Sequence, residues 1–463
     1  MLTFLMQSIN ARATMLIGLE SILIVGSLIL GTMLVAGGQE AWSIVGTPAG
    51  FLRLALVAAV CQACLYYTDL YDLRIIANRR ELFARTFHSL AAASIILAAV
   101  YALLPDLGVG PGVVIAATFV VMATVPGWRV LFESVVRHVS PRERLVIVGA
   151  SSAAVGLASE LTERRYALGL EIVGFVTAAG ARPSTGAFRV LGDIADIPAI
   201  VQRYHVDRVV VSLADARGSL PMDQLLDMKM RGVTFDYLAS VYERYTGKIA
   251  VENLRPSWLI FSAGFRATPR LLGFKRLLDV VIALVGLVVT APLMLLVALA
   301  VKLTSPGPAL YHQQRVGERG RVFTVHKFRS MRVNAEADSG AVWSREGDTR
   351  TTSVGRFLRA ARLDELPQLW NILRGDMSLV GPRPERPEFI QRLSELIPYY
   401  GQRHVVKPGL TGWAQVRYAY GSSVEDALEK LQYDLFYIKN MSLALDLLIV
   451  FSTIKTVMSR RGI

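Results

Sequence analysis

Two adjacent acidic residues, Asp364 and Glu365, stand in a C-terminal stretch that is rich in arginine and lysine. Neighbouring residues of a helix point about 100° apart, so one carboxylate can reach a phosphorus atom while the other binds a hard cation such as Mg²⁺. Arginine is suited to forked contacts with phosphate oxygens. The basic residues of the nearby motifs are Lys327, Arg329, Arg359, Arg362 and Arg383. The pattern predicts a site for phosphate chemistry.

The prolines of this stretch predict how the charged residues are held. Pro367 suits the first turn of a helix, which would place both carboxylates near a helix N-terminus, where backbone N–H groups bind anions. The run Gly381–Pro384 predicts a stiff turn that presents Arg383 with little entropy to lose. Taken singly, each basic residue is better explained as a solvated or lipid-facing charge. Their convergence on one carboxylate pair favours the phosphate site.

The elements that must position this site belong to a membrane protein. The chain has 463 residues, of which 53% are hydrophobic and only 19% charged, which excludes disorder. Its mean hydropathy is +0.42. Four apolar runs, each close to the roughly 20 residues that cross a bilayer, predict four transmembrane helices within residues 1–140. The runs are 14–35, 51–67, 87–104 and 113–131. A buried helical bundle of a soluble protein is the alternative.

The charge distribution predicts the orientation of these helices. Arginines follow the second run, at Arg74, Arg79, Arg80 and Arg85, and the fourth, at Arg129, Arg137, Arg142 and Arg144. The other two loops contain no lysine or arginine, so both ends of the bundle are expected in the cytoplasm. The net charge of +13 is attributed to this bias and to anionic lipids. No nucleic-acid partner is expected, because no basic run exceeds two residues.

The two cysteines, Cys61 and Cys64, have a C-x-x-C spacing inside an apolar run. Redox or metal chemistry there would need polar surroundings or further ligands. The six histidines are scattered along the chain and accompany neither cysteine. We therefore expect no zinc site and no disulfide framework.

Residues 141–262 have the rhythm of a Rossmann-like α/β domain. Short β-rich runs alternate with helix-length segments, at 145–148, 171–176, 208–212 and 233–237. A glycine-rich turn, Gly149–Gly156, follows the first run, but Ser151 and Ala154 replace the second and third glycines of the dinucleotide fingerprint. No cofactor is assigned to this domain, and a structural or regulatory role is favoured over NAD binding.

A fifth apolar run, at about 277–301, is interrupted by Pro292. Its length is sufficient to span a membrane, yet both of its ends are basic, at Lys275, Arg276 and Lys302. Proline removes an internal hydrogen bond and kinks a helix. We therefore predict a re-entrant helix, broken at Pro292, that enters and leaves the same leaflet and anchors an α-rich domain.

Residues 271–463 resemble a known family through six motifs in order: FKRLLDVV, HKFRSM, LDELPQLWN, GDMSLVGPRPE, KPGLTGWAQV and YDLFYIKN. Together these motifs are similar to those of the bacterial sugar transferases, the polyprenyl-phosphate hexose-1-phosphate transferases. The membrane helices and α/β domain ahead of them resemble the large-form members. Those members are of the undecaprenyl-phosphate glucose or galactose phosphotransferase type and initiate exopolysaccharide or O-antigen synthesis.

The resemblance implies a two-step glycosyl-1-phosphate transfer. Asp364 would attack the sugar-bearing phosphorus of a UDP-hexose and expel UMP, and undecaprenyl phosphate would then take the phosphosugar. Glu365 would hold Mg²⁺, which stabilises the leaving group. The residues expected to bind substrate phosphate are Lys327, Arg329, Arg359, Arg383 and Pro384.

The resemblance also implies a location. Pro292 would correspond to the helix-breaking proline of the family, although Ala291 precedes it where some members have serine. The protein is expected in the bacterial inner membrane, with its catalytic domain facing the cytoplasm, where the nucleotide sugar and the lipid phosphate meet. The hexose, the polysaccharide, the ligand of the α/β domain and the formation of a homodimer are left open.

Two other functions are alternatives to the transferase. A membrane-bound nucleotide-sugar dehydratase or epimerase would need a complete glycine fingerprint and a Tyr-x-x-x-Lys pair, whereas Tyr245 and Lys248 are one residue too close. A non-catalytic scaffold for polysaccharide assembly stays as the second alternative. The intact residues Asp364, Glu365 and Arg383 argue against it.

Overall fold

The computed structural model divides the chain into two compact units, residues 1–238 and 239–463. It describes residues 11–458, apart from 40–41, 43–45, 69, 72–78, 109, 140–142, 164–168, 179–184, 213–220, 252–261, 263, 266, 334, 336–347, 419–420 and 422. Each unit is described by itself. Among the described residues, five helices are long and apolar enough to cross a membrane, four in the first unit and one in the second.

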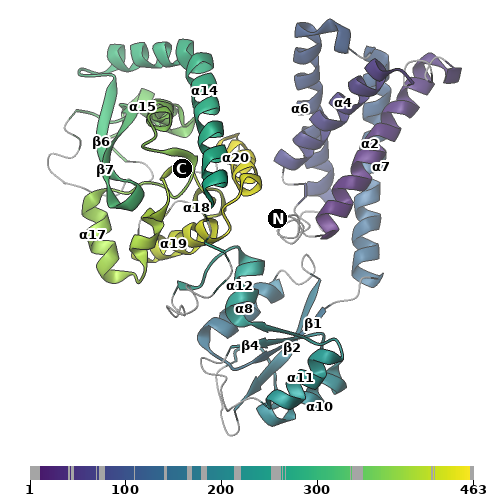
Figure 1. Ribbon diagram of the computed structural model, residues 1–463. Coiled ribbons are helices and arrows are strands. Elements are labelled where there is room, and N and C mark those ends of the chain that lie inside the picture. Colours follow the sequence, from purple (N-terminus) through teal and green to yellow (C-terminus); the bar gives the residue numbers. More distant parts are fainter. Residues whose placement is uncertain are drawn as a thin grey trace. The chain divides into compact units, whose positions relative to one another are not determined.

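The first unit begins with four apolar helices: α2 (Ala11–Ala36), α4 (Pro48–Tyr67), α6 (Arg79–Leu103) and α7 (Pro111–Val139) (Figure 1). They enclose a common apolar core that includes Ile24, Leu65, Leu82 and Val125. Large apolar side chains such as Ile95 and Phe119 remain exposed on their outer faces. Apolar residues that cover a helix on all sides are typical of a membrane span, so the expected apolar helices are present.

A buried ion pair ties two of these helices together. Arg129 Nε lies 2.5 Å from Glu20 Oε1, and both side chains are fully buried. Arg129 also donates to the Leu70 carbonyl and lies over the ring of Tyr71. The charge pattern assigns Arg129 to a cytoplasmic loop. That assignment is wrong, because α7 extends to Val139 and keeps Arg129 inside the bundle.

The α/β region has a five-stranded parallel sheet with the order β3-β2-β1-β4-β5. Its strands are β1 (Glu143–Val148), β2 (Leu170–Thr177), β3 (Val190–Asp193), β4 (Arg208–Val211) and β5 (Thr234–Tyr237). The helices are α8 (Ser152–Glu163), α10 (Ile197–Tyr204) and α11 (Met222–Met230), with the short turn η2 (Ile194–Asp196). The parallel α/β region is as expected. The sequence does not predict the edge strand β3, because it has only four residues and is partly exposed.

Both faces of this sheet are covered. Val146 and Val148 of β1 belong to a buried cluster with residues of α10 and α11. Leu145 and Ile147 point to the opposite face and are also fully buried. A strand that is buried on both faces reads as a continuous apolar run, which explains why β1 was visible in the sequence.

The second unit surrounds the carboxylate pair with short elements. After α12 (Leu238–Thr246) and α14 (Pro269–Thr304) come an antiparallel ribbon of β6 (Leu310–Val316) and β7 (Val322–Phe328), joined by η4 (Glu318–Gly320). The next elements are α15 (Ser353–Ala360), η5 (Leu363–Glu365), α16 (Gln368–Arg374), β8 (Ser378–Val380), α17 (Pro387–Leu396), η6 (Tyr400–Val405) and β9 (Gly409–Thr411). The last are α18 (Trp413–Arg417), α19 (Val424–Lys439) and α20 (Leu443–Met458).

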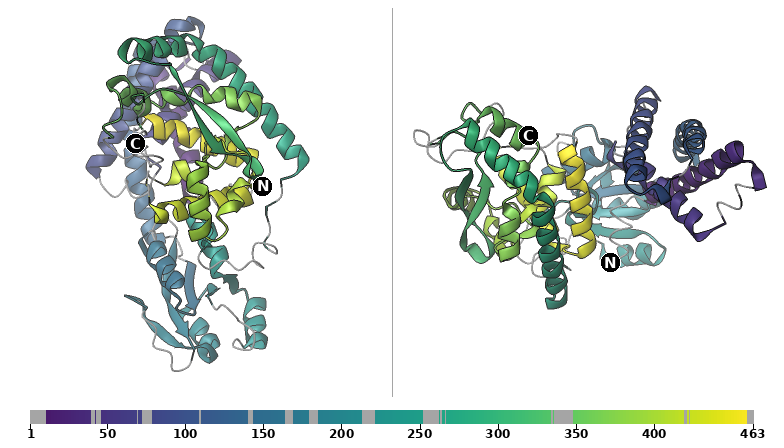
Figure 2. Two further views of the ribbon diagram at one scale, coloured as in Figure 1. Left: turned by 90° about the vertical axis from the view of Figure 1, so that its left-hand side faces the viewer. Right: turned by 90° about the horizontal axis from the view of Figure 1, so that it is seen from above.

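Helix α14 is 36 residues long and contains Pro292 in its interior. Its ribbon changes direction part-way along in the views of Figures 1 and 2. Ahead of Pro292, Ala283 shares a buried apolar cluster with Leu369 of α16. Beyond it, Val297 shares another with Leu358 of α15. A straight helix of this length would extend for about 54 Å, so the bend lets both halves pack on the same domain.

Candidate active site

The two carboxylates lie in the short 3-10 turn η5, between α15 and α16. Arg362 precedes this turn with a left-handed backbone (φ of 56°), which ends the preceding helical run and redirects the chain. Pro367 is the N-cap residue of α16, so the carboxylates lie just ahead of a helix N-terminus, as its position suggested. Asp364 and Glu365 are each only 8% exposed. Carboxylates buried to this degree need cationic partners.

Three cations from separate segments surround one oxygen, Oε1 of Glu365. Arg383 Nη2 lies 2.5 Å away, Lys327 Nζ of β7 lies 3.4 Å away, and Arg362 Nη1 lies 3.8 Å away. Arg383 comes from the loop after β8, 18 residues further along the chain than Glu365. The fold therefore brings together the carboxylates and three of the five basic residues of the predicted site.

The two carboxyl groups have opposite pKa shifts. Burial, together with the negative charge of Glu365, raises the pKa of Asp364 to about 6. Burial alone would also raise the pKa of Glu365, but the surrounding cations outweigh it and hold that pKa well below the usual range. Arg383 makes the largest of these cationic contributions. Glu365 is therefore a permanent anion that gathers cations, while Asp364 changes charge near neutral pH.

Arg359 and Arg329 occupy different places. Arg359 of α15 contacts Thr351 Oγ1 at 3.4 Å, and its charge lowers the pKa of Asp364, so it lies within electrostatic reach of the pair. Arg329 is buried beyond β7, where Nη2 donates to the carbonyl and hydroxyl oxygens of Ser305. Its Nε and Nη1 have no hydrogen-bond partner among the residues that the structure describes. A role of Arg329 in phosphate binding stays a prediction.

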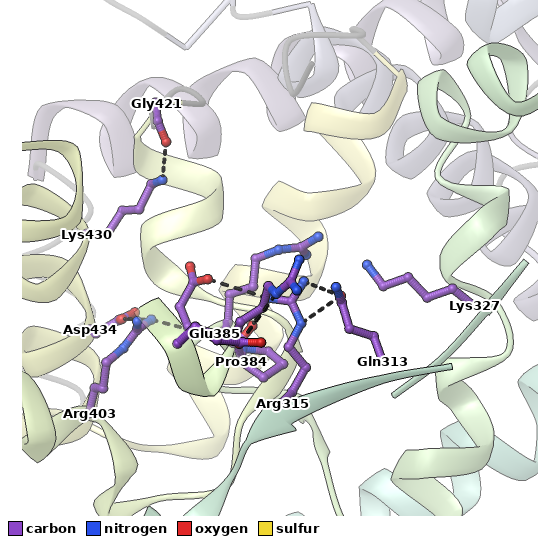
Figure 3. A network of polar contacts seen from close by, with 12 residues as sticks. Gln313, Arg315, Lys327, Pro384, Glu385, Arg403, Gly421, Lys430 and Asp434 are labelled. Carbon is purple, nitrogen blue, oxygen red and sulfur yellow. Dashed lines mark hydrogen bonds and ion pairs between the residues drawn. The ribbon is translucent and has the colours of Figure 1, made fainter. Parts of the chain in front are cut away.

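Behind the loop of Arg383 lies a polar network that sequence reasoning did not identify (Figure 3). Arg315 of β6 donates to the carbonyl of Pro384, and Arg403 of η6 forms a buried ion pair with Asp434 of α19 at 2.8 Å. Lys327 points towards the same region (Figure 3). These residues are far apart in the sequence and lie in no spacing that predicts chemistry. Only their burial in the folded chain sets these charged residues apart from charged residues at the surface.

The donor set of this site suits a magnesium ion that arrives with a substrate. Carboxylate oxygens are the hard ligands that Mg²⁺ takes, usually one or two of them together with substrate phosphates and water. The three cations gather at Oε1 of Glu365, so its second oxygen is the one that a metal ion would use. In the described part of the chain, no group of three or more His, Cys, Asp or Glu could hold a metal by itself. The residues therefore fit Mg²⁺ only in company with phosphate.

A buried carboxylate pair among converging cations, in a chain with several membrane-type helices, is the arrangement expected of a membrane protein that acts on phosphate groups. Residues 270–460 match the family described as bacterial sugar transferase. Residues 67–219 match a family described as a CoA-binding domain.

Curated relatives extend this match. The UDP-glucose:undecaprenyl-phosphate glucose-1-phosphate transferase of Escherichia coli (strain K12) is 35% identical over 325 residues, which cover 67% of each chain. The UDP-N-acetylgalactosamine-undecaprenyl-phosphate N-acetylgalactosaminephosphotransferase of Aeromonas hydrophila is 42% identical over 226 residues, 49% of this chain and 52% of that protein. The chain thus spans about half the length of the Aeromonas relative.

A third relative is matched over nearly its whole length. The exopolysaccharide production protein PSS of Rhizobium leguminosarum bv. phaseoli is 41% identical over 191 residues, which cover 40% of this chain and 96% of that protein. The chain belongs to the bacterial sugar transferase family, the polyprenyl-phosphate hexose-1-phosphate transferases.

Proposed function

We propose that the protein transfers a hexose-1-phosphate from a UDP-sugar to undecaprenyl phosphate, which gives undecaprenyl-diphosphate-sugar and UMP. The observation that carries this proposal is the unequal carboxylate pair, in which Asp364 is buried with a raised pKa beside a cation-bound Glu365. The names of the relatives from Escherichia coli and Aeromonas hydrophila, both undecaprenyl-phosphate sugar phosphotransferases, support the reaction class.

In the first step, a carboxylate oxygen of Asp364 attacks the phosphorus atom that bears the sugar. The bond between this phosphorus and the oxygen bridging to UMP breaks, and UMP leaves with the electron pair. The enzyme then holds a phosphosugar as a mixed anhydride on Asp364. Covalent catalysis of this kind divides one difficult transfer into two easier ones and predicts ping-pong kinetics. The pKa of about 6 leaves Asp364 ionised, and therefore nucleophilic, at neutral pH.

In the second step, an oxygen of undecaprenyl phosphate attacks the same phosphorus atom. The bond to Asp364 breaks and the free carboxylate is restored. The cations around the pair stabilise the negative charge that develops on the phosphoryl oxygens in both steps. Lys327, Arg359 and Arg383 would serve in this way.

Glu365 would hold Mg²⁺ through its second carboxylate oxygen, Oε2, while Oε1 binds the cations. A bound magnesium ion supplies charge neutralisation of the diphosphate and stabilises the departing phosphate. Glu365 itself also keeps Arg383 and Lys327 directed at the reaction centre.

The bent α14 supports a re-entrant anchor. Its two halves pack on the same domain, as expected if both ends leave the membrane on one side. The site would then face the cytoplasm at the surface of the inner membrane, where the nucleotide sugar and the head of the lipid phosphate are both within reach. Exopolysaccharide initiation is the corresponding cellular role, supported by the name of the Rhizobium relative.

The test is UMP release by the purified chain in nanodiscs that contain undecaprenyl phosphate and Mg²⁺. UDP-glucose, UDP-galactose and UDP-N-acetylgalactosamine are supplied singly, because the names of the relatives include both glucose and N-acetylgalactosamine. UMP release with one of them, together with a labelled lipid product, supports the proposal and names the sugar. Folded protein that releases no UMP with any of them would contradict it and favour the scaffold role.

A further inference from the structure

The backbone of the loop from Gly381 to Glu385 is held at both ends by other backbone groups. Gly381 N–H donates to the carbonyl of Thr411, and the carbonyl of Pro382 accepts from the N–H of Gly409, both at 2.9 Å. At the far end, the carbonyl of Glu385 accepts from a backbone N–H of β6, also at 2.9 Å. These bonds fix the two ends of the loop.

The two carbonyls between these ends are held by arginine side chains. Arg403 Nη2 donates to the carbonyl of Arg383, and Arg315 Nη1 donates to the carbonyl of Pro384, each at 3.0 Å. Prolines have no backbone N–H, so a Pro-Arg-Pro segment cannot be held in place by a regular strand ladder. Arginine side chains therefore donate the hydrogen bonds that a neighbouring strand would donate in a sheet. Arg403 holds the carbonyl of Arg383, which binds Glu365, and Arg315 holds the carbonyl of the next residue.

Both clamping arginines are anchored from behind (Figure 3). Arg403 is only 5% exposed, and it donates to Asp434 at 2.8 Å and to the hydroxyl of Tyr400 at 2.6 Å. Arg315 donates through Nη2 and Nε to Gln313, at 2.7 and 3.1 Å. It also lies 3.5 Å from a carboxylate oxygen of Glu385. Burying two guanidinium groups is unfavourable unless their donors are satisfied. One nitrogen of each arginine, Nη2 of Arg403 and Nη1 of Arg315, donates to a carbonyl of the loop.

We propose that Arg403 and Arg315 are positioning residues that hold consecutive carbonyls of the loop and so direct the guanidinium of Arg383 onto Glu365. This inference rests on the proposed function, because it assigns a purpose to Arg383 at the reaction centre. Neither arginine needs to touch the substrate. A chain of contacts leads from Asp434 of α19 through Arg403 and the backbone of Arg383 to Glu365.

The first test compares Arg403→Lys, Arg403→Gln and Arg315→Lys with the wild-type chain in nanodiscs, with UMP release as the readout. A displacement of Arg383 by about 1 Å lowers kcat by up to about 100-fold. KM for the UDP-sugar should change much less, because Arg383 acts mainly on charge that develops in the transition state. Arg403→Lys keeps a positive charge beside Asp434 but lacks the two terminal nitrogens of a guanidinium. It should therefore retain only part of the activity that Arg403→Gln loses.

Two controls separate positioning from simple loss of stability. Lys248→Gln removes an ion pair of the same type, Lys248 to Glu429 at 2.7 Å, on the same domain but away from the loop. It should lower the unfolding temperature and leave kcat per folded enzyme unchanged. Arg403→Lys should also add no further loss of kcat to Arg383→Gln. Equal losses of kcat from Arg403→Lys with and without Arg383 would overturn the proposal.

The second test needs no substrate. Unfolding temperatures are measured for Arg403→Lys, Glu365→Gln and the double variant, and the same set is repeated in the Arg383→Gln background. Among the contacts that the structure describes, Arg403 and Glu365 are linked only through Arg383, so coupling should exist only while Arg383 is present. Additive effects in the wild-type background would overturn the inference. A wild-type chain that releases no UMP would contradict only the proposed function and leave this cycle valid.

Discussion

At the scale of single residues, the site depends on a difference between two adjacent carboxyl groups. Burial by itself would raise the pKa of both groups, but Glu365 forms ion pairs with Arg383, Lys327 and Arg362, which hold its pKa below the usual range. Two carboxyl groups whose surroundings push their pKa values apart can take different roles. The one that titrates near neutrality suits the nucleophile, and the one that stays ionised suits a metal ligand and organiser of cations.

Replacing Asp364 by Asn should abolish both UMP release and the covalent phosphosugar adduct, because an amide cannot form the mixed anhydride. The loss should reach about four orders of magnitude or more. Adduct formation is measured by retention of label from a UDP-sugar that is radiolabelled in the sugar. The unfolding temperature serves as the control for folding. Wild-type turnover in this variant would remove Asp364 from the nucleophile role.

The rate of adduct formation should depend on the ionisation of Asp364. Because its pKa is raised to about 6, the carboxylate is present above that pH and is lost as the pH falls through it. UMP release should therefore rise with pH and level off above about 7. Arg383 lowers the pKa of Asp364, so Arg383→Gln should shift this rise in the rate of UMP release to higher pH. A rise in the wild-type rate centred near pH 3.8, the ordinary pKa of an aspartate, would contradict the assignment of Asp364 as the nucleophile.

Glu365→Gln should weaken the dependence on magnesium without removing the nucleophile. A neutral amide oxygen is a poorer ligand for Mg²⁺ than a carboxylate. The concentration of Mg²⁺ that gives half-maximal UMP release should rise about tenfold or more. Chelation with EDTA should abolish turnover in the wild-type chain. Equal magnesium curves for the wild type and the variant would exclude Glu365 as the ligand.

At the scale of elements, the bend of α14 links the membrane anchor to the carboxylates. Residues ahead of Pro292 cluster with Leu369 of α16, and residues beyond it cluster with Leu366, which directly follows η5. Both halves of the helix thus pack against residues that closely follow Asp364 in the chain. An element placed in this way can fix the distance between the site and the membrane surface.

Pro292→Ala restores a backbone hydrogen bond and should favour a straight α14. Both halves could then no longer pack on the same domain, so UMP release should fall and the polypeptide beyond the helix should move across the membrane. In a Cys61→Ala, Cys64→Ala background, a Val322→Cys label site is tested with a membrane-impermeant maleimide on intact cells. Val322 is exposed, which makes the introduced thiol reactive.

With Pro292 present, the Val322→Cys site should be protected in intact cells, and with Ala at position 292 it should be labelled. Leu104→Cys is the control, because this exposed residue follows α6 on the side expected to face outwards. It should be labelled in both cases. Labelling of Val322→Cys in the chain that keeps Pro292 would exclude the re-entrant arrangement.

At the scale of the whole molecule, the described contacts of the site all lie within residues 239–463. The segment after α12 is part of this unit, since Lys248 pairs with Glu429 and Trp413 Nε1 donates to the carbonyl of Gly247. The Rhizobium relative, matched over 96% of its length by 191 residues, has the size of the C-terminal region alone. We therefore expect the second unit to build the site by itself.

A chain that begins at Ala239 should release UMP in nanodiscs at a rate within about threefold of the full chain, because local geometry rather than distant elements sets the barrier. The measurement compares kcat per folded enzyme for the two chains under identical lipid and magnesium conditions. Loss of turnover in a truncated chain with an unchanged unfolding transition would show that residues 1–238 contribute to catalysis.

The sequence alone determined the local features of this protein. Apolar runs of membrane length, the alternation of short strands and helices, and the ordered motifs around Asp364 and Glu365 are all properties of contiguous residues, so periodicity and spacing reveal them. The edge strand β3 was not predicted, because four residues are too few to show a periodic pattern. The burial of Arg129 escaped because its partner, Glu20, is more than a hundred residues away.

Only the tertiary structure decided which charges meet. Arg329 and Lys327 are two residues apart, yet Lys327 contacts Glu365 while Arg329 binds Ser305. Arg315, Arg403 and Asp434 converge behind Arg383 from three elements that nothing in the linear pattern connects. A pKa of about 6 for Asp364 likewise needs its burial and its neighbours together. Burial and electrostatic contact depend on distances in space, and folding alone sets those distances.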